Sequence, residues 1–324
     1  MKPRMNADKR RLFVILLVLC AVACLAACQP GVRQAASEES QSLRVLASAS
    51  FLADIAQNVA GERLKVESLI PSGLDPHAFE PTPRDVARIA DSQVLVVNGA
   101  GFEAWLEDVL VNAGGERLLI EASQGLAGDS AGNQAGGKKG EPGAKHAQEV
   151  DPHFWLDPSL AVRYVENIRD GLSQADPAGA DTYAQNAANY IAQLKELDAW
   201  IQAQLLQIPP ERRLLVTNHE SFGYFADRYG FKVVGAVIPS ISTGSSPSAE
   251  QLAQLVDAIR STHAPAIFLE IGANPALAEQ VAAETGIRVV TDLYSHSLTP
   301  PDGVAPTYLD MMRHNVQVIV DALR

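Results

Sequence analysis

The stretch Leu214-Leu-Val-Thr217 is a short run of aliphatic and β-branched residues, bounded by charged and polar residues, which is typical of a buried strand. Similar runs recur along the chain, with segments long enough for a crossover helix between most of them. They span residues 43–47, 64–70, 94–97, 118–120, 232–237, 266–269 and 288–291. Such alternation predicts βαβ units with parallel strands. We therefore expect an α/β protein of two lobes, each a parallel sheet flanked by helices.

A long amphipathic helix is expected between the two sets of strands, over residues 180–208. Apolar residues recur there every three or four positions from Tyr183 to Ile208. Asp176-Pro177 supplies a start signal and Pro209-Pro210 a stop signal, which gives a helix of roughly 43 Å. Periodicity alone leaves two interpretations open: a helix that crosses both lobes, or a long core helix of one lobe.

The N-terminal pattern predicts an export signal over residues 1–27, because a basic segment is followed by an apolar run and then by small residues. The segment Leu25-Ala26-Ala27-Cys28 resembles a bacterial lipobox, which implies cleavage before Cys28 and a diacylglycerol on its thiol. The alternative is an uncleaved anchor or an ordinary signal. Residues 28–42 are small and polar, as in a flexible tether. We thus expect an extracytoplasmic protein held to a membrane through Cys28.

The composition of the chain excludes some classes of function and some kinds of metal site. The chain has 324 residues and a formal charge of −12, which disfavours binding to a nucleic-acid backbone. All three cysteines lie in the export signal or at its end, so a metal site in the folded part must use nitrogen and oxygen ligands. Residues 125–150 are rich in glycine and poor in large apolar residues, and we expect a mobile surface loop there.

Four of the seven histidines follow strand-like runs at points where loops rich in Pro, Gly or Asp begin. They are His77, His153, His219 and His296. In open α/β sheets, ligands bind at the carboxyl ends of the strands, so two such histidines per lobe would converge on the cleft between the lobes. Each alone could be a structural histidine, but the set indicates a metal site.

The sequence around these histidines resembles the metal-binding lipoproteins of bacterial ABC importers for zinc and manganese. The shared motifs are Asp75-Pro76-His77, Asp151-Pro152-His153, Asp176-Pro-Ala, Thr217-Asn-His219-Glu-Ser-Phe-Gly-Tyr-Phe225, Pro247-Ser-Ala249 and Thr307-Tyr-Leu-Asp-Met-Met-Arg-His-Asn315. The resemblance implies two lobes joined by a rigid linking helix, with one divalent ion bound between them and passed to a membrane permease. It also implies that His77, His153 and His219 are ligands. The corresponding division is 43–178 for the first lobe, 179–210 for the linking helix and 211–324 for the second lobe.

The fourth ligand position departs from the family's pattern, in which an aspartate occupies this slot. Here the slot in Leu293-Tyr-Ser-His296 holds histidine. Either His296 is the fourth ligand, which we favour, or Asp292 swings in. Four imidazoles suit Zn²⁺, whereas Mn²⁺ prefers oxygen ligands. We predict a monomeric zinc receptor, with a manganese receptor as the alternative.

Other functions fit the residues less well. A zinc hydrolase would need an open coordination position and a general base such as Glu220. An adhesin or a receptor for a metal chelate is compatible with lipidation, but no aromatic or arginine-rich pocket is apparent. Glu270 either orients a ligand imidazole or caps a helix, and these two roles are equally favoured. His263 and His314 are expected to be structural.

Overall fold

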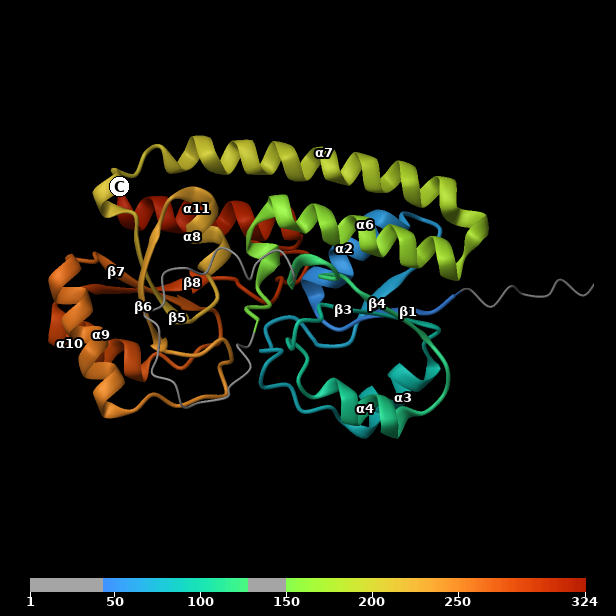
Figure 1. Cartoon of the computed structure of the whole chain (residues 1–324), viewed down its shortest axis with the longest axis horizontal. Helices are drawn as coiled ribbons and strands as arrows, with labels where there is room; N and C mark the ends of the chain where they lie inside the picture. Colours follow the sequence, from blue (N-terminus) through green and yellow to red (C-terminus); the bar gives the residue numbers. More distant parts are fainter. Residues whose placement is uncertain (1–42, 128–149) are drawn as a thin grey trace, which may run out of the picture. The chain divides into compact units, whose positions relative to one another are not determined.

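Two four-stranded parallel sheets form the framework of the computed structural model, which describes residues 43–127 and 150–324 (Figure 1). The first sheet has the order β2-β1-β3-β4 and the second β6-β5-β7-β8. Their bounds are β1 (Val45–Ala47), β2 (Val66–Ser68), β3 (Val94–Val97), β4 (Leu118–Glu121), β5 (Leu214–His219), β6 (Lys232–Ile238), β7 (Ala266–Glu270) and β8 (Arg288–Leu293). All pairings are parallel, so the predicted α/β fold with two sheets is confirmed.

The two central strands of each sheet are buried on both faces, as is usual in parallel sheets. In β3, Val94 and Val96 face one apolar cluster, whereas Leu95 and Val97 face another. Strand β7 alternates in the same way between two clusters. This period of two explains why the strands appear in the sequence as continuous apolar runs.

Helices cover both faces of both sheets. The outer faces carry α3 (Pro83–Asp91), α4 (Leu106–Ala113), α9 (Ala249–Thr262) and α10 (Ala276–Thr285). The inner faces carry α2 (Ser50–Ala60), α6 (Pro158–Ala175), α8 (Gly223–Tyr229) and α11 (Tyr308–Leu323). The inner helices of the two lobes share one continuous apolar core, which also contains residues of both sheets. The lobes are therefore packed against each other and are not independent domains.

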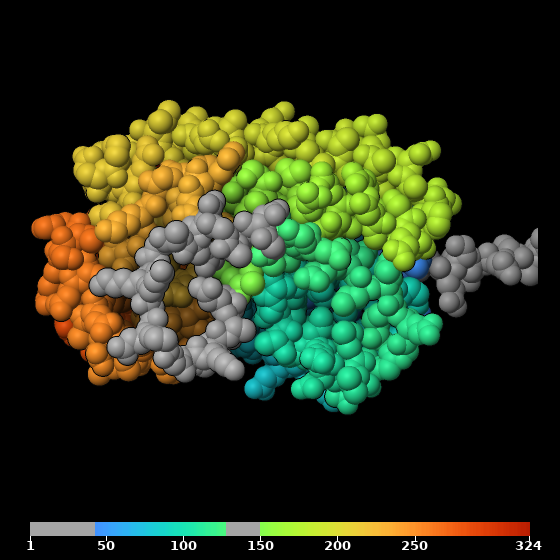
Figure 2. All heavy atoms as spheres, in the orientation of Figure 1, coloured from blue at the N-terminus to red at the C-terminus, as the bar shows by residue number. Residues whose placement is uncertain are grey.

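Helix α7 (Ala180–Leu205) packs against α2 and α6 of the first lobe and against α11 of the second. Figures 1 and 2 show it running along one side of both lobes. The predicted apolar stripe is buried, from Tyr183 to Leu205. Of the two interpretations, the helix that spans both lobes is the one observed. The helix ends at Leu205, three residues before the predicted end. The prediction was too long because Ile208 is also buried in the core, which it reaches through a turn after the helix.

Within the described ranges, no helix is long and apolar enough to cross a membrane. The predicted export signal, Cys28 and the tether lie outside the described residues, as does most of the predicted loop over 125–150.

Candidate metal centre

The four predicted histidines lie on four different segments, at the edges of the sheets where the carboxyl ends of the strands meet. His219 is the last residue of β5, and His296 follows the end of β8 by three residues. His153 immediately precedes a short 3₁₀ helix (Phe154–Leu156) that leads into α6. His77 lies between β2 and α3, in a segment of turns and extended backbone. The topology thus brings together residues that are up to 219 positions apart in sequence, between His77 and His296.

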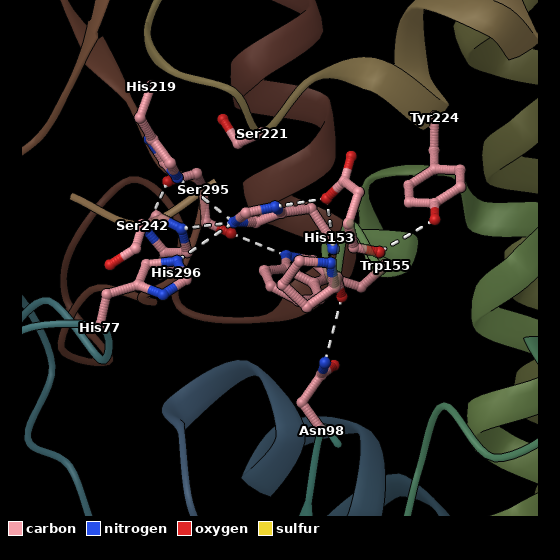
Figure 3. Close-up of polar contacts among 12 residues, drawn as sticks. His77, Asn98, His153, Trp155, His219, Ser221, Tyr224, Ser242, Ser295 and His296 are labelled. Atoms are coloured by element: carbon pink, nitrogen blue, oxygen red, sulfur yellow. Dashed lines mark hydrogen bonds and ion pairs between the residues drawn. The ribbon is translucent and has the colours of Figure 1, made fainter. Parts of the chain in front are cut away.

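The Nε2 atoms of the four rings converge on one point. Nε2 of His153 lies 3.2 Å from Nε2 of His77, of His219 and of His296. One nitrogen of each ring lies within 4.8 Å of the corresponding nitrogen of every other ring. Figure 3 shows the rings turned toward one another. In a tetrahedral site with Zn–N bonds of about 2.05 Å, the nitrogens lie about 3.3 Å apart, so the three distances from His153 fit such a site.

Carboxylates hold the opposite ring nitrogens of three of these histidines. Asp151 Oδ1 lies 2.7 Å from Nδ1 of His153. Glu270, at the end of β7, lies beside two of the histidines: its Oε1 lies 2.7 Å from Nδ1 of His219, and its Oε2 lies 3.1 Å from Nδ1 of His296. An ionised carboxylate beside Nδ1 favours the tautomer that carries the proton on Nδ1 and leaves the lone pair of Nε2 free. Several lone pairs therefore point at the same place, which is unfavourable unless a cation lies between them.

The electrostatics of the buried site determine which of these groups carry charge in the metal-free protein. Burial lowers the pKa of His77 to about 2 and that of His153 well below its ordinary value. Burial also opposes ionisation of Glu270, but His219 and His296 beside it hold the pKa of this carboxyl well below its usual range. Burial disfavours protonation of His219, while Glu270 overcomes that effect and raises its pKa. In the metal-free site, His77 and His153 therefore resist protonation, whereas His219 and Glu270 favour a charged pair.

The Asp-Pro-His repeat has a local role that the sequence analysis missed. Asp75 Oδ1 accepts the backbone N–H of His77 at 2.9 Å, and Asp151 Oδ1 accepts that of His153 at 3.0 Å. Each aspartate therefore fixes the turn that presents its histidine, in an Asx-type arrangement. The repetition of the aspartate before each histidine was the available signal in the sequence.

The segment that carries His153 is tied to both lobes. Asn98, which follows β3, donates from Nδ2 to the carbonyl of Pro152 at 3.1 Å (Figure 3). From α8, the hydroxyl of Tyr224 donates to the carbonyl of Asp151 at 2.9 Å. His153 itself is completely buried. These bonds leave its ring little freedom.

Aromatic side chains close the site on the side of the first lobe. The ring of Phe102 lies 4.9 Å from that of His77 and 5.0 Å from that of Trp155, centroid to centroid. Trp155 donates from its indole N–H to the carbonyl of Ser295 at 2.7 Å, next to His296. An apolar wall excludes water and strengthens the electrostatic interactions inside.

The remaining candidates lie apart from the cluster. Asp292 is exposed, and its backbone carbonyl accepts a bond of 2.9 Å from the ring of His314. His263 ends α9 in the left-handed conformation, with φ of 57°. Glu220 is exposed, although it follows His219 in the chain. Of the two roles left open for Glu270, orientation of an imidazole is the one that its position beside His219 and His296 favours.

Residues 45–322 match the family described as zinc-uptake complex component A, periplasmic. This chain belongs to that family. Among curated relatives, it is 33% identical to the manganese-binding lipoprotein MntA of Halalkalibacterium halodurans, over 89% of this chain and 90% of the relative. It is 32% identical to the iron-binding protein YfeA of Yersinia pestis, over 87% of each. Among solved structures, the periplasmic zinc-binding protein TroA of Treponema pallidum superposes with a TM-score of 0.75, at 27% identity over 87% of this chain and 99% of that one. The family resemblance seen in the sequence is confirmed, but these relatives are named for three different metals.

Proposed function

We propose that this chain is the extracytoplasmic receptor of a metal ABC transporter and that its cargo is one Zn²⁺ ion. The proposed ligands are Nε2 atoms of His77, His153, His219 and His296. The observation that carries the proposal is the convergence of these four nitrogens at spacings that suit a tetrahedral ion. Delivery to a membrane permease is the role that membership of the family supports.

The donor set favours zinc over manganese. Imidazole nitrogen suits Zn²⁺, whereas Mn²⁺ prefers carboxylate and water oxygens and binds such sites more weakly. Here the carboxylates of Glu270 and Asp151 face the far nitrogens of the rings and do not point at the convergence point. Cu²⁺ and Ni²⁺ would also accept four nitrogens, so metal supply contributes to selectivity in the cell.

A manganese receptor is the second candidate, because relatives with about a third of their residues identical are named as manganese-binding lipoproteins. The two candidates differ in a measurable quantity, the ratio of the Zn²⁺ and Mn²⁺ dissociation constants. A zinc hydrolase is not favoured, since four protein ligands leave no position for a reactive water.

The test is metal analysis of protein purified without added metal or chelator, by inductively coupled plasma mass spectrometry. Competition with a chromogenic chelator then gives the affinity for each metal. We expect one zinc per chain and much weaker binding of manganese. The double variant His77→Ala/His153→Ala should lose the tight site, whereas His263→Asn, which removes a histidine outside the cluster, should retain it. A tighter constant for manganese than for zinc would exclude the zinc assignment.

We further propose that the mature chain begins at Cys28, is acylated there and works as a monomer, with residues 43–178 and 211–324 as its lobes and 179–210 as the link. Expression in a bacterium that processes lipoproteins should yield a membrane-bound protein with the mass of an acylated Cys28. The variant Cys28→Ala should appear without the lipid mass. Recovery of lipid on that variant would contradict the assignment.

A further inference from the structure

His77 differs from the other three histidines in how it is held. The other three each have a carboxylate beside Nδ1, and all three are buried. Among the described residues, no carboxylate pairs with Nδ1 of His77, and its side chain is only partly buried. His77 lies in the segment 69–82, which we call the His77 loop. What fixes this loop therefore determines whether His77 reaches the metal.

Two hydrogen bonds join the His77 loop to the second lobe. The hydroxyl of Thr243, between β6 and α9, donates to Oδ2 of Asp75. The hydroxyl of Ser297, beyond β8, accepts the backbone N–H of Gly73 at 2.6 Å. Asp75 carries the effect onward, because its other oxygen holds the backbone N–H of His77. A chain of direct contacts thus leads from Thr243 to the ligand.

The loop has a separate attachment to its own lobe. The indole of Trp105 donates to the carbonyl of Pro76 at 3.1 Å. At the end of the loop, Thr82 and Asp85 cap α3 with reciprocal bonds. These contacts can persist if the His77 loop moves away from the second lobe, whereas the bonds of Thr243 and Ser297 must break. The two cross-lobe bonds are therefore specific to the closed state.

A cavity of about 290 Å³ lies beside these bonds. Both bonded pairs line it, and so do His296 and Glu270. Water or a competing ligand in this cavity would lie next to His296 and Glu270.

We propose that Thr243 and Ser297 are positioning residues that clamp the His77 loop to the second lobe and so set the rate at which the metal leaves. This proposal rests on the zinc site proposed above. Each bond stabilises the closed state of the loop, and the hydroxyl of Thr243 faces a carboxylate, which strengthens that bond. Loss of one such bond should speed zinc release about fivefold, and loss of both about 25-fold if the effects are independent.

The experiment measures zinc release from the full mature chain after mixing with an excess of a chromogenic chelator. The variants are Thr243→Val, Ser297→Ala and the double variant. Thr243→Ser keeps the hydroxyl and should restore the wild-type rate. Ser245→Ala is the matched control, because it removes a hydroxyl from the same 239–248 loop whose partner, Ser240, belongs to the same lobe. Its release rate should stay within about twofold of wild type.

A spectroscopic readout separates positioning from general destabilisation. In the Co²⁺-loaded protein, four imidazoles give an intense visible band, and loss of His77 to water weakens it. We expect a weaker band in the double variant and an unchanged thermal midpoint of the metal-free protein. Release from the double variant at the wild-type rate, or from Thr243→Ser as fast as from Thr243→Val, would overturn the proposal.

The zinc-site proposal and the clamp proposal are contradicted by different results. Absence of tight zinc in the wild type removes both. If the wild type binds zinc tightly through His77 and His153, but the Thr243→Val/Ser297→Ala variant releases zinc at the wild-type rate, only the clamp proposal is wrong.

Discussion

Replacing Glu270 with glutamine tests the assignment of the site more sharply than removal of a ligand. Glu270 is almost completely buried and faces Nδ1 of both His219 and His296, at 2.7 and 3.1 Å. Glutamine preserves the shape but replaces one acceptor oxygen with an N–H₂ donor. That donor meets an imidazole N–H, so one ring must change its tautomer or turn away from the metal.

The expected magnitude follows from the two contacts. Loss of one outer carboxylate partner typically weakens metal binding 10- to 100-fold, and Glu270 has two ligand partners, so we expect the upper end, about 100-fold or about 2.8 kcal/mol. The measurement is the zinc dissociation constant by chelator competition at pH 7.5. Thermal unfolding of the metal-free variant checks that it folds.

Glu220→Gln is the matched control for this experiment. Glu220 follows His219 in the chain and carries the same charge, but its side chain is exposed. Its replacement should change the constant by no more than about twofold. A constant for Glu270→Gln within threefold of the wild type would refute the idea that this carboxylate orients the ligands.

Further outcomes follow from the same geometry. His296→Ala should weaken zinc binding far more than Asp292→Ala, because Asp292 is exposed and lies outside the cluster; the reverse ranking of dissociation constants would return the fourth ligand to Asp292. The apparent zinc affinity, measured from pH 5 to 7.5, should fall as pH falls, because protons displace the metal from His219, whose pKa is raised. A plot of the logarithm of zinc affinity against pH should have a slope below three protons per zinc, since the lowered pKa values of His77 and His153 keep these rings neutral throughout that range. A slope of three or four would contradict these lowered pKa values. Deleting residues 128–145, which lie outside the described part of the chain, should leave thermal stability and zinc affinity nearly unchanged on compositional grounds, and a tenfold loss of affinity would contradict this.

The sequence predicted those features that depend on local pattern. All eight strands overlap predicted runs. For the central strands β1, β3 and β7 the reason is that strands buried on both faces must be apolar at consecutive positions. The stripe of α7 was recognised for a similar reason. The helix end was wrong by three residues, since Ile208 keeps the helical spacing but reaches the core through a turn. An apolar pattern reports burial, and it does not report the backbone conformation that achieves it.

The site was predictable only in part. The convergence of the histidines follows from the topology, because parallel strands deliver their carboxyl ends to one edge. The contacts of Glu270 and Thr243 could not be predicted from the topology, because each contact depends on the relative placement of segments far apart in sequence. The bond from Thr243 to Asp75 joins residues 168 positions apart. No local signal marks such a threonine.

The unequal support of the four histidines argues for a site that releases its metal. A permanent structural zinc would benefit from four ligands that are equally fixed, since any loose ligand lowers its affinity. Here three of the proposed ligands are buried beside carboxylates, whereas His77 lies on a loop attached to the opposite lobe through two hydroxyl groups. Three fixed imidazoles can capture an ion before the fourth closes on it. The same ion becomes accessible again when a few weak bonds break, and the shared core of α2, α6, α7 and α11 need not be disturbed. Reversible closure of one ligand on a rigid framework is what a carrier requires.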